Sequence, residues 1–344
     1  MRFSFYPSPF TLYPLPFTLY PLLFLLQNPF DMTTTTPPKP ECSGVLVMDK
    51  PAGITSHDVV ACVRKILHQR QVGHFGTLDP FATGVLPVSV GKATRFAQFY
   101  LKSRKAYEGT IHFGFTTDTY DATGEATSEV IPAALGSSML EEHFRQFTGR
   151  LLQTPPPYSA KRVGGVRAYE LARRHKPVNL APVEVEIYAL ELLGLQGAQV
   201  RFAVECSGGT YVRSLAHDLG QKMGCGAHLA SLRRTAVAEF TLQRSITLEC
   251  LQEAAEHGDL ESCLVRMEAL LPDCPELVVR GREETSVRHG HAFELAQALR
   301  PGRGGPPGVA PAAHLLKILG PERRLIAVAK HVSGAIYHPD LVLV

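Results

Sequence analysis

The sequence lacks the residue patterns that mark disulfide, metal or nucleotide-cofactor chemistry. It has seven cysteines, an odd number, and no two of them have Cys-x-x-Cys spacing. A disulfide framework or a zinc site is therefore not expected, and a reducing, cytoplasmic location is the simplest interpretation. HExxH, Walker and Rossmann glycine motifs are also missing, so the motifs predict neither a metal nor a cofactor.

Strong charge and long apolar runs are missing as well. The formal net charge is +3, which is compatible with a nucleic-acid partner but does not require one. Prolines interrupt the apolar residues of segment 1–41, so no membrane span is expected there, and the longest proline-free apolar piece, 22–26, is too short for a signal peptide. We interpret 1–41 as a disordered, proline-rich extension, and we hypothesise that translation begins at Met32.

The composition of the rest is that of a globular protein. The chain has 344 residues, 45% of them hydrophobic and 19% charged, which predicts about two domains with a sizeable core. The composition changes near residue 276, where short apolar strands alternate with loops and with a Gly/Pro-rich insert at 302–311 that is predicted to be mobile.

One glycine-rich stretch, residues 73–87, presents a single carboxylate. It reads Gly-His-Phe-Gly-Thr-Leu-Asp-Pro-Phe-Ala-Thr-Gly-Val-Leu-Pro, with Asp79 as its only acid and His74 five residues earlier. The glycines allow a tight backbone, and Pro80 disfavours helical geometry at Asp79. On residues alone, this stretch could be an ordinary Asp-Pro turn or a stiff loop that displays one acid.

Three further residues stand out by their positions. Lys50 closes a short apolar strand at 44–51, and Tyr107 opens another strand at 107–113. Arg213 falls in the first turn of a helix that follows a strand and a glycine turn at 206–220. Because a cation is unfavourable at a helix N-terminus, Arg213 is expected to have another reason for its position, and a carboxylate partner is one such reason. Pattern alone also allows Lys50 to be a surface lysine and Tyr107 a half-buried strand residue.

Two polar segments complete the candidate residues. The segment 114–124 contains Asp118 and Asp121, which Asx-turn chemistry explains better than a metal site does. The segment 161–176 is strongly basic, as expected either of a solvated face or of a surface that follows phosphates. Its candidate RNA-binding residues are Lys161, Arg162, Arg167, Arg173 and Arg174.

Residues 73–87 resemble the catalytic loop of the TruB family of tRNA pseudouridine synthases, G-H-x-G-x-L-D-P-x-A-T-G-x-L-P. Other segments are similar to that family in the same order: 49–56 to its first motif, 105–107 to its K-x-Y element, 114–124 to its T-D-T-x-D-x-x-G segment, and 165–173 to its tRNA-gripping insertion. The resemblance covers roughly residues 43–272.

The resemblance implies an α+β protein with the pseudouridine-synthase fold, in which helices flank a mixed, largely antiparallel central sheet. Residues 42–272 would form the catalytic domain, with the RNA-gripping insertion at about 150–180. Residues 273–344 would form a small PUA-like β-barrel, and whether it contacts RNA is left open.

The resemblance also implies an activity, the isomerisation of uridine 55 in the tRNA T-loop to pseudouridine, with the tRNA T-arm as partner and with no metal, cofactor, membrane or obligate protein partner. Asp79 would be the catalytic residue, kept ionised by Arg213. Tyr107 would stack on the target base, and His74 would fill the place that the base leaves. Tyr211 and Lys50 would contribute to the substrate pocket.

Two other functions fit parts of the same pattern. A hydrolase such as a nucleosidase could use Asp79, although glycosidases usually need a second carboxylate, and the loop has none. A non-catalytic tRNA-binding or tRNA-folding protein could share the scaffold. The basic segment 161–176 favours direct tRNA binding over guidance by a second RNA.

Overall fold

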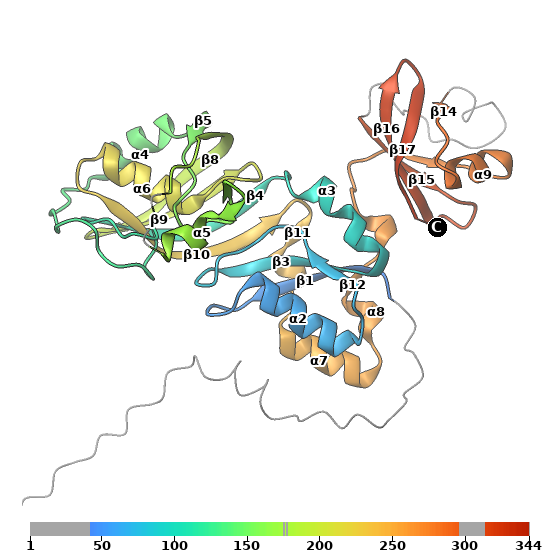
Figure 1. Ribbon diagram of the computed structural model, residues 1–344, viewed down its shortest axis with the longest axis horizontal. Helices are drawn as coiled ribbons and strands as arrows, with labels where there is room; N and C mark the ends of the chain where they lie inside the picture. The colour runs from blue at the N-terminus through green and yellow to red at the C-terminus, as the bar shows by residue number, and fades with distance from the viewer. Residues whose placement is uncertain (1–41, 175, 177, 296–313, 344) are drawn as a thin grey trace, which may run out of the picture. The chain divides into compact units, whose positions relative to one another are not determined.

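The structure is a computed structural model that describes residues 42–174, 176, 178–295 and 314–343 (Figure 1). The predictions made for the extension 1–41, for a start at Met32 and for the insert at 302–311 lie outside these residues.

Most of the described chain is built on a ten-stranded sheet. Along the sheet the order is β12-β1-β3-β10-β4-β9-β8-β5, with β2 also paired to β3 and β11 to β10. All pairings in this sheet are antiparallel except that of β3 with β10. The strands are β1 (Gly44–Lys50), β2 (Val72–His74), β3 (Thr83–Val90), β4 (Lys105–Phe113), β5 (Gly149–Gln153), β8 (Val183–Gln196), β9 (Gln199–Cys206), β10 (Ala227–Val237), β11 (Phe240–Thr241) and β12 (Leu264–Val265).

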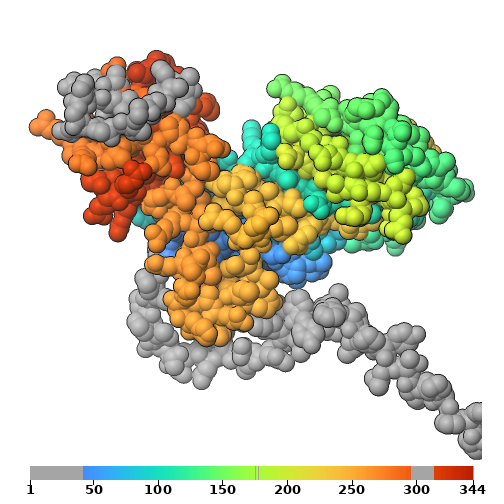
Figure 2. Space-filling view, turned by 180° about the vertical axis from the view of Figure 1, so that it is seen from behind, coloured from blue at the N-terminus to red at the C-terminus, as the bar shows by residue number. Residues whose placement is uncertain are grey.

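Helices cover the sheet in two groups. The helices of this part are α2 (Ser56–Leu67), α3 (Ala97–Tyr100), α4 (Ser137–Gln146), α6 (Val212–Lys222), α7 (Leu248–His257) and α8 (Leu260–Cys263), with 3₁₀ turns η2 (Gly91–Phe96), η3 (Leu242–Arg244) and η4 (Met267–Ala269). Near one end of the strand order, α2 and α7 lie together beside β1 and β3, whereas α4 packs beside β8 and α6 beside β10 (Figure 1). The space-filling view shows the green and yellow-green segments around α4, β5 and β8 side by side (Figure 2).

Two separate apolar clusters anchor these helices. The cluster under α6 contains Leu215 and Leu219 with Tyr107 and Phe202 of the sheet. The other packs the apolar face of α2, including Val59 and Val63, against β1 and β3. Helix α2 begins at Ser56, because Thr55 and Asp58 form a reciprocal capping box. Since this cap adds about 1 kcal/mol, it fixes where the helix starts, next to the Asp79 loop.

A basic hairpin and a short helix lie between β5 and β8. Strand β6 (Arg162–Val163) pairs with β7 (Val166–Arg167), and α5 (Ala168–Ala172) follows at once. Gly164 and Gly165, with φ of 56° and 84°, make the tight turn between the two strands.

The C-terminal residues form a second, five-stranded sheet in the order β13-β15-β16-β17-β14. Its elements are β13 (Glu276–Val278), α9 (Arg282–Arg288), β14 (Phe293–Glu294), β15 (Leu315–Leu319), β16 (Leu325–Ser333) and β17 (Ile336–Val342). Its core includes Leu277, Ile318 and Tyr337. The composition change near residue 276 therefore does mark a change of sheet. None of the helices in the described ranges is long and apolar enough to cross a membrane.

Candidate active site

The Asp79 loop runs from β2 to β3 and is pinned at its centre. Ser56, the first residue of α2, donates its hydroxyl to the Leu78 carbonyl at 3.0 Å and accepts the Leu78 N–H at 2.8 Å. The Ala82 N–H donates to the Asp79 carbonyl at 3.1 Å, and the side chains of Leu78 and Ala82 are buried. Asp79 is therefore displayed on a backbone whose neighbouring residues are fixed on both sides.

Asp79 and Arg213 form a bidentate ion pair. Nε of Arg213 lies 2.9 Å from one carboxylate oxygen, and Nη2 lies 3.0 Å from the other. The side chain of Arg213 is 7% exposed and that of Asp79 is 33% exposed. The carboxylate partner predicted for this helix-N-terminal arginine is thus confirmed, and the carboxylate keeps an open side toward solvent.

Arg213 is held by more than this one partner. Its Nη1 donates to the Thr119 carbonyl at 3.0 Å and lies 3.5 Å from Oδ2 of Asp121, while its Nη2 donates to the Tyr158 carbonyl at 3.1 Å. Asp121 is only 3% exposed. A guanidinium that satisfies two carboxylates and two carbonyls has little freedom to turn.

Asp121 combines the predicted turn chemistry with a second task. Its Oδ1 accepts the Thr123 N–H at 3.0 Å and the Thr119 hydroxyl at 2.8 Å, which is the Asx-type geometry expected from the sequence. The contact of its other oxygen with Arg213 was missed. The sequence gives no direct signal for it, because the contact depends on where α6 packs.

Lys50 supports the loop from the side of Pro80. Its ammonium donates to the carbonyls of Pro51, Ile54 and Pro80 at 2.7, 2.8 and 3.2 Å, and the residue is fully buried. Burial lowers the pKa of Lys50 to about 8, although the nearby charge of Asp79 acts to raise it. All three donors of the ammonium are used in these bonds, so Lys50 acts on the predicted substrate pocket through the backbone beside Asp79.

Tyr107 and Tyr211 are both protonated phenols at neutral pH. Tyr107 is 7% exposed, and burial raises its pKa to about 12. Tyr211 precedes the first residue of α6, and its backbone N–H and carbonyl are held by the Gln153 side chain at 2.8 and 3.0 Å. Burial raises the pKa of Tyr211 as well.

His74 is half-buried at the end of β2. Its Nδ1 accepts the Gly76 N–H at 3.2 Å, so this nitrogen carries no proton. Burial lowers the pKa of His74, and the charge of Arg234 adds to the effect. The imidazole is therefore neutral near pH 7.

The predicted RNA-binding residues are all exposed. They occupy the β6–β7 hairpin, α5 and the residues beside them: Lys161, Arg162, Arg167, Arg173 and Arg174. The guanidinium of Arg173 lies 5.5 Å from the centre of the Tyr169 ring, and Arg162 donates to the Gly165 carbonyl. This unit joins the ion-pair site through the Tyr158 carbonyl, three residues before Lys161.

Comparisons with family models and with known proteins all identify the same family. Residues 64–212 match the family model described as TruB family pseudouridylate synthase (N terminal domain), and residues 213–272 match the one described as tRNA pseudouridylate synthase B C-terminal domain. The tRNA pseudouridine synthase B of Solibacter usitatus is 46% identical over 300 residues, which is 87% of this chain and 99% of that protein.

The chain belongs to the TruB family. A second relative, the tRNA pseudouridine synthase B of Aquifex aeolicus, is 42% identical over 249 residues, covering 72% of this chain and 85% of that one. Among solved structures, a chain of an H/ACA RNP bound to a substrate RNA containing 2′-deoxyuridine superposes with a TM-score of 0.65 at 26% identity, over 88% of this chain and 85% of that chain. The predicted fold class is thus confirmed, including a C-terminal sheet that is consistent with a PUA-like domain.

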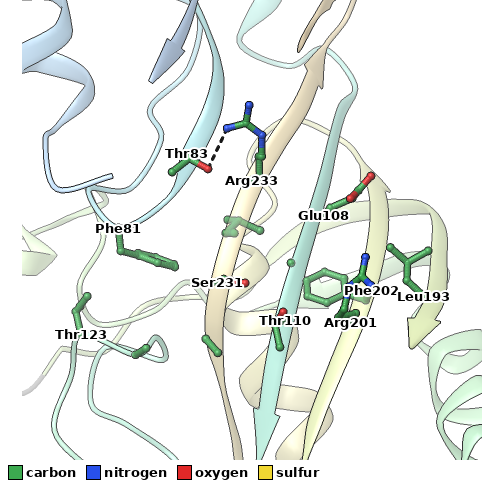
Figure 3. A pocket seen from close by; sticks show the side chains of 14 residues that line it. Phe81, Thr83, Glu108, Thr110, Thr123, Leu193, Arg201, Phe202, Ser231 and Arg233 are labelled. Atoms are coloured by element: carbon green, nitrogen blue, oxygen red, sulfur yellow. Dashed lines mark hydrogen bonds between the residues drawn. The ribbon is translucent and has the colours of Figure 1, made fainter. Parts of the chain in front are cut away.

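In this TruB-family chain a groove with several polar side chains, called the polar groove below, lies on the face of the sheet opposite to Tyr107 (Figure 3). The groove has a volume of about 380 Å³, and its lining includes Glu108, Thr110, Ser231 and Arg233. Because side chains alternate along a strand, Glu108 faces away from Tyr107. Asp79 and Arg213 do not line the groove, although Phe81, two residues after Asp79, does.

Within the described residues, no group of three or more His, Cys, Asp and Glu side chains is arranged to hold a metal ion. None of the seven cysteines forms a disulfide bond in the described residues.

Proposed function

We propose that the chain isomerises uridine 55 in the T-loop of tRNA to pseudouridine, with Asp79 as the catalytic residue. The observation that carries the proposal is the bidentate pairing of a part-exposed Asp79 with a buried Arg213, in a chain whose relatives are named tRNA pseudouridine synthase B. The reaction breaks the C1′–N1 bond, turns the base and forms a C1′–C5 bond. One proton leaves C5 and one is gained at N1, so no oxidant or reductant is consumed.

Asp79 supplies the carboxylate that the reaction needs, as nucleophile or as base. Arg213 holds both carboxylate oxygens, which favours the charged form and fixes its direction. Asp121 is oriented by the same guanidinium but is almost completely buried. Asp79 is thus the carboxylate of this pair that has a side open to a substrate.

The pocket residues act on a base removed from its stack. Extrusion of a nucleotide costs a few kcal/mol, and stacking on an aromatic ring returns about 1–3 kcal/mol. Tyr107 is the ring that we propose for this contact, with Tyr211 beside the same ion pair. His74, neutral at pH 7, would occupy the place of the extruded base without adding a buried charge.

The exposed basic residues of 161–174, called the basic unit below, supply the contact with RNA. We propose that its five cations contact phosphates of the T-arm and give a salt-dependent affinity. In this proposal residues 42–272 form the catalytic domain, with the RNA-gripping insertion at about 150–180, and residues 273–344 a PUA-like domain. Cysteines in the reduced form are compatible with the cytoplasmic location that we propose.

The deciding experiment is to incubate the protein with a T-arm RNA and no additive, and then to map pseudouridine in the product. The wild type is expected to convert one uridine. Asp79→Asn is expected to lower the single-turnover rate by at least about 10³-fold, with tRNA affinity within a few-fold. Asp49→Asn is the matched control, because Asp49 pairs with Arg233 at the groove.

Other outcomes identify the rival functions. Release of free uracil by the wild type would identify a nucleosidase. Tight tRNA binding by the wild type with no modified nucleotide would identify a non-catalytic RNA-binding protein.

A further inference from the structure

Arg234 is a fully buried arginine that none of the roles described above uses. It lies on β10 next to Arg233, and it is the largest side chain in the described part of the molecule that is buried this completely. The two neighbours face opposite sides of the sheet, since Arg233 lines the polar groove and pairs with Asp49. Arg234 therefore points toward the side that carries Asp79 and Tyr107.

Three hydrogen bonds of Arg234 go to the backbone around Asp79, and a further side-chain hydrogen bond goes to Tyr107. Its Nη2 donates to the Gly76 carbonyl at 3.1 Å, its Nη1 to the Thr77 carbonyl at 3.1 Å, and its Nε to the Val85 carbonyl at 2.7 Å. Gly76 and Thr77 precede Asp79, whereas Val85 follows it in β3. One planar group thus joins the two ends of the loop and fixes the span that Asp79 crosses.

The backbone of Arg234 is equally tied to this region. In the parallel pairing of β10 with β3, Arg234 lies opposite Gly84, and a Cβ atom at Gly84 would come within 2.2 Å of the Arg234 carbonyl oxygen. On its other side Arg234 lies opposite Tyr107 of β4. Arg234 is therefore the residue of β10 that stands between the Asp79 loop and Tyr107.

A buried cation without a carboxylate partner is costly unless its hydrogen bonds are complete. Here three carbonyl oxygens provide them. The charge also reaches its surroundings, since Arg234 adds to the effect of burial in lowering the pKa of Lys50 and of Lys105. Keeping a charged residue at this position is understandable if the shape of the loop depends on it.

We propose that Arg234 is a positioning residue, which sets the place of the Asp79 carboxylate relative to the Tyr107 ring by joining both ends of the loop. The inference rests on the proposed function, because it assumes that Asp79 and Tyr107 act on one base. Lysine cannot replace this arginine fully, since a single ammonium lacks the planar fork that reaches three separated carbonyls.

The test compares Arg234→Lys and Arg234→Met with the wild type in three measurements: the single-turnover rate of pseudouridine formation, the tRNA dissociation constant, and the thermal midpoint. Displacement of a catalytic group by about 1 Å costs on the order of 100-fold in rate. We expect a loss of about that size for Arg234→Met and a smaller one for Arg234→Lys, with tRNA affinity within about three-fold. Arg233→Lys is the matched control and is expected to keep the wild-type rate.

Each result decides the matter. A rate loss with unchanged tRNA affinity, and partial rescue by lysine, supports the positioning role. Wild-type rates in Arg234→Lys and Arg234→Met overturn it. A parallel fall of rate, affinity and thermal midpoint in Arg234→Lys also overturns it, since that result describes a general packing role, and this variant decides alone if Arg234→Met does not fold. Failure of the proposed function is distinguishable, because the wild type itself would then form no pseudouridine.

Discussion

The Asp79 loop and the basic unit at residues 161–174 are built in opposite ways. Buried groups hold the loop from several directions: Ser56 at Leu78, Lys50 at Pro80, Arg234 at Gly76 and Thr77. The basic unit consists of a hairpin with two residues in each strand and a helix of about one turn, and its cations are exposed. The difference matches the roles that we propose for them, because catalysis requires a fixed geometry, whereas binding to a phosphate backbone tolerates adjustment.

The largest expected effect comes from replacing Arg213, which holds Asp79 and Asp121 at the rigid region, that is, the Asp79 loop and the residues that hold it. Arg213→Met leaves Asp121 with a buried, uncompensated charge, because Asp121 is 3% exposed. We expect a destabilisation of about 3–5 kcal/mol, measured by urea unfolding, together with loss of detectable turnover. Adding Asp121→Asn to this variant should recover stability but not activity. Recovery of both would show that Arg213 acts only as a structural counter-ion.

A smaller effect is expected from the exposed region, and it should be of a different kind. Replacing Lys161, Arg162 and Arg167 together by alanine should weaken tRNA binding by roughly 10- to 100-fold at physiological salt. The slope of log affinity against log salt should fall by about 1 for each residue that contacts a phosphate. The single-turnover rate at saturating tRNA should not change. A lower rate at saturation would contradict the division between the two regions.

The smallest effect concerns buried lysines near the rigid region. Burial lowers the pKa of Lys50 and of Lys105 from 10.5 to about 8. Between about pH 8 and 10.5 the unfolded chain then binds more protons than the folded chain at these groups, so the free energy of unfolding rises with pH in that window. This gain in the free energy of unfolding is lost as the pH falls to the pKa of about 8 that the lysines have in the folded chain.

Lys105→Met isolates one of these two lysines. Its ammonium donates only to the Leu101 and Ser103 carbonyls and is not bonded to the Asp79 loop. Measured from about pH 8 to 9.5, the variant should show a flatter rise in unfolding free energy than the wild type. Equal slopes in the two proteins would mean that Lys105 titrates alike in the folded and unfolded chains.

The sequence predicts the pairing of Asp79 with Arg213 because two signals converge on it. A cation at a helix N-terminus needs a partner, and the family resemblance names one. The sequence does not predict the positions of Lys50 and Arg234. Both donate to backbone carbonyls, which any residue supplies, so a buried lysine or arginine of this kind looks in sequence like a surface one.

The element boundaries show the same limit. The apolar residues 86–90 predict a strand, but β3 begins already at Thr83, because pairing with β10 adds Thr83 and also Gly84, which has little strand propensity of its own. Residues 93–101 predict a helix, but they form a 3₁₀ turn, η2, followed by the single turn of α3. In both places tertiary packing, which acts over long sequence distances, decides the outcome.

The carbonyl oxygen of Tyr158 gives the contrast between the two regions a mechanical consequence. It accepts a hydrogen bond from Arg213, and three residues later the basic unit begins at Lys161. The peptide group of Tyr158 therefore connects the backbone that leads into the basic unit with the guanidinium that orients Asp79. A shift of the backbone at 158–161 would change a hydrogen bond of Arg213 and, through it, the setting of the Asp79 carboxylate.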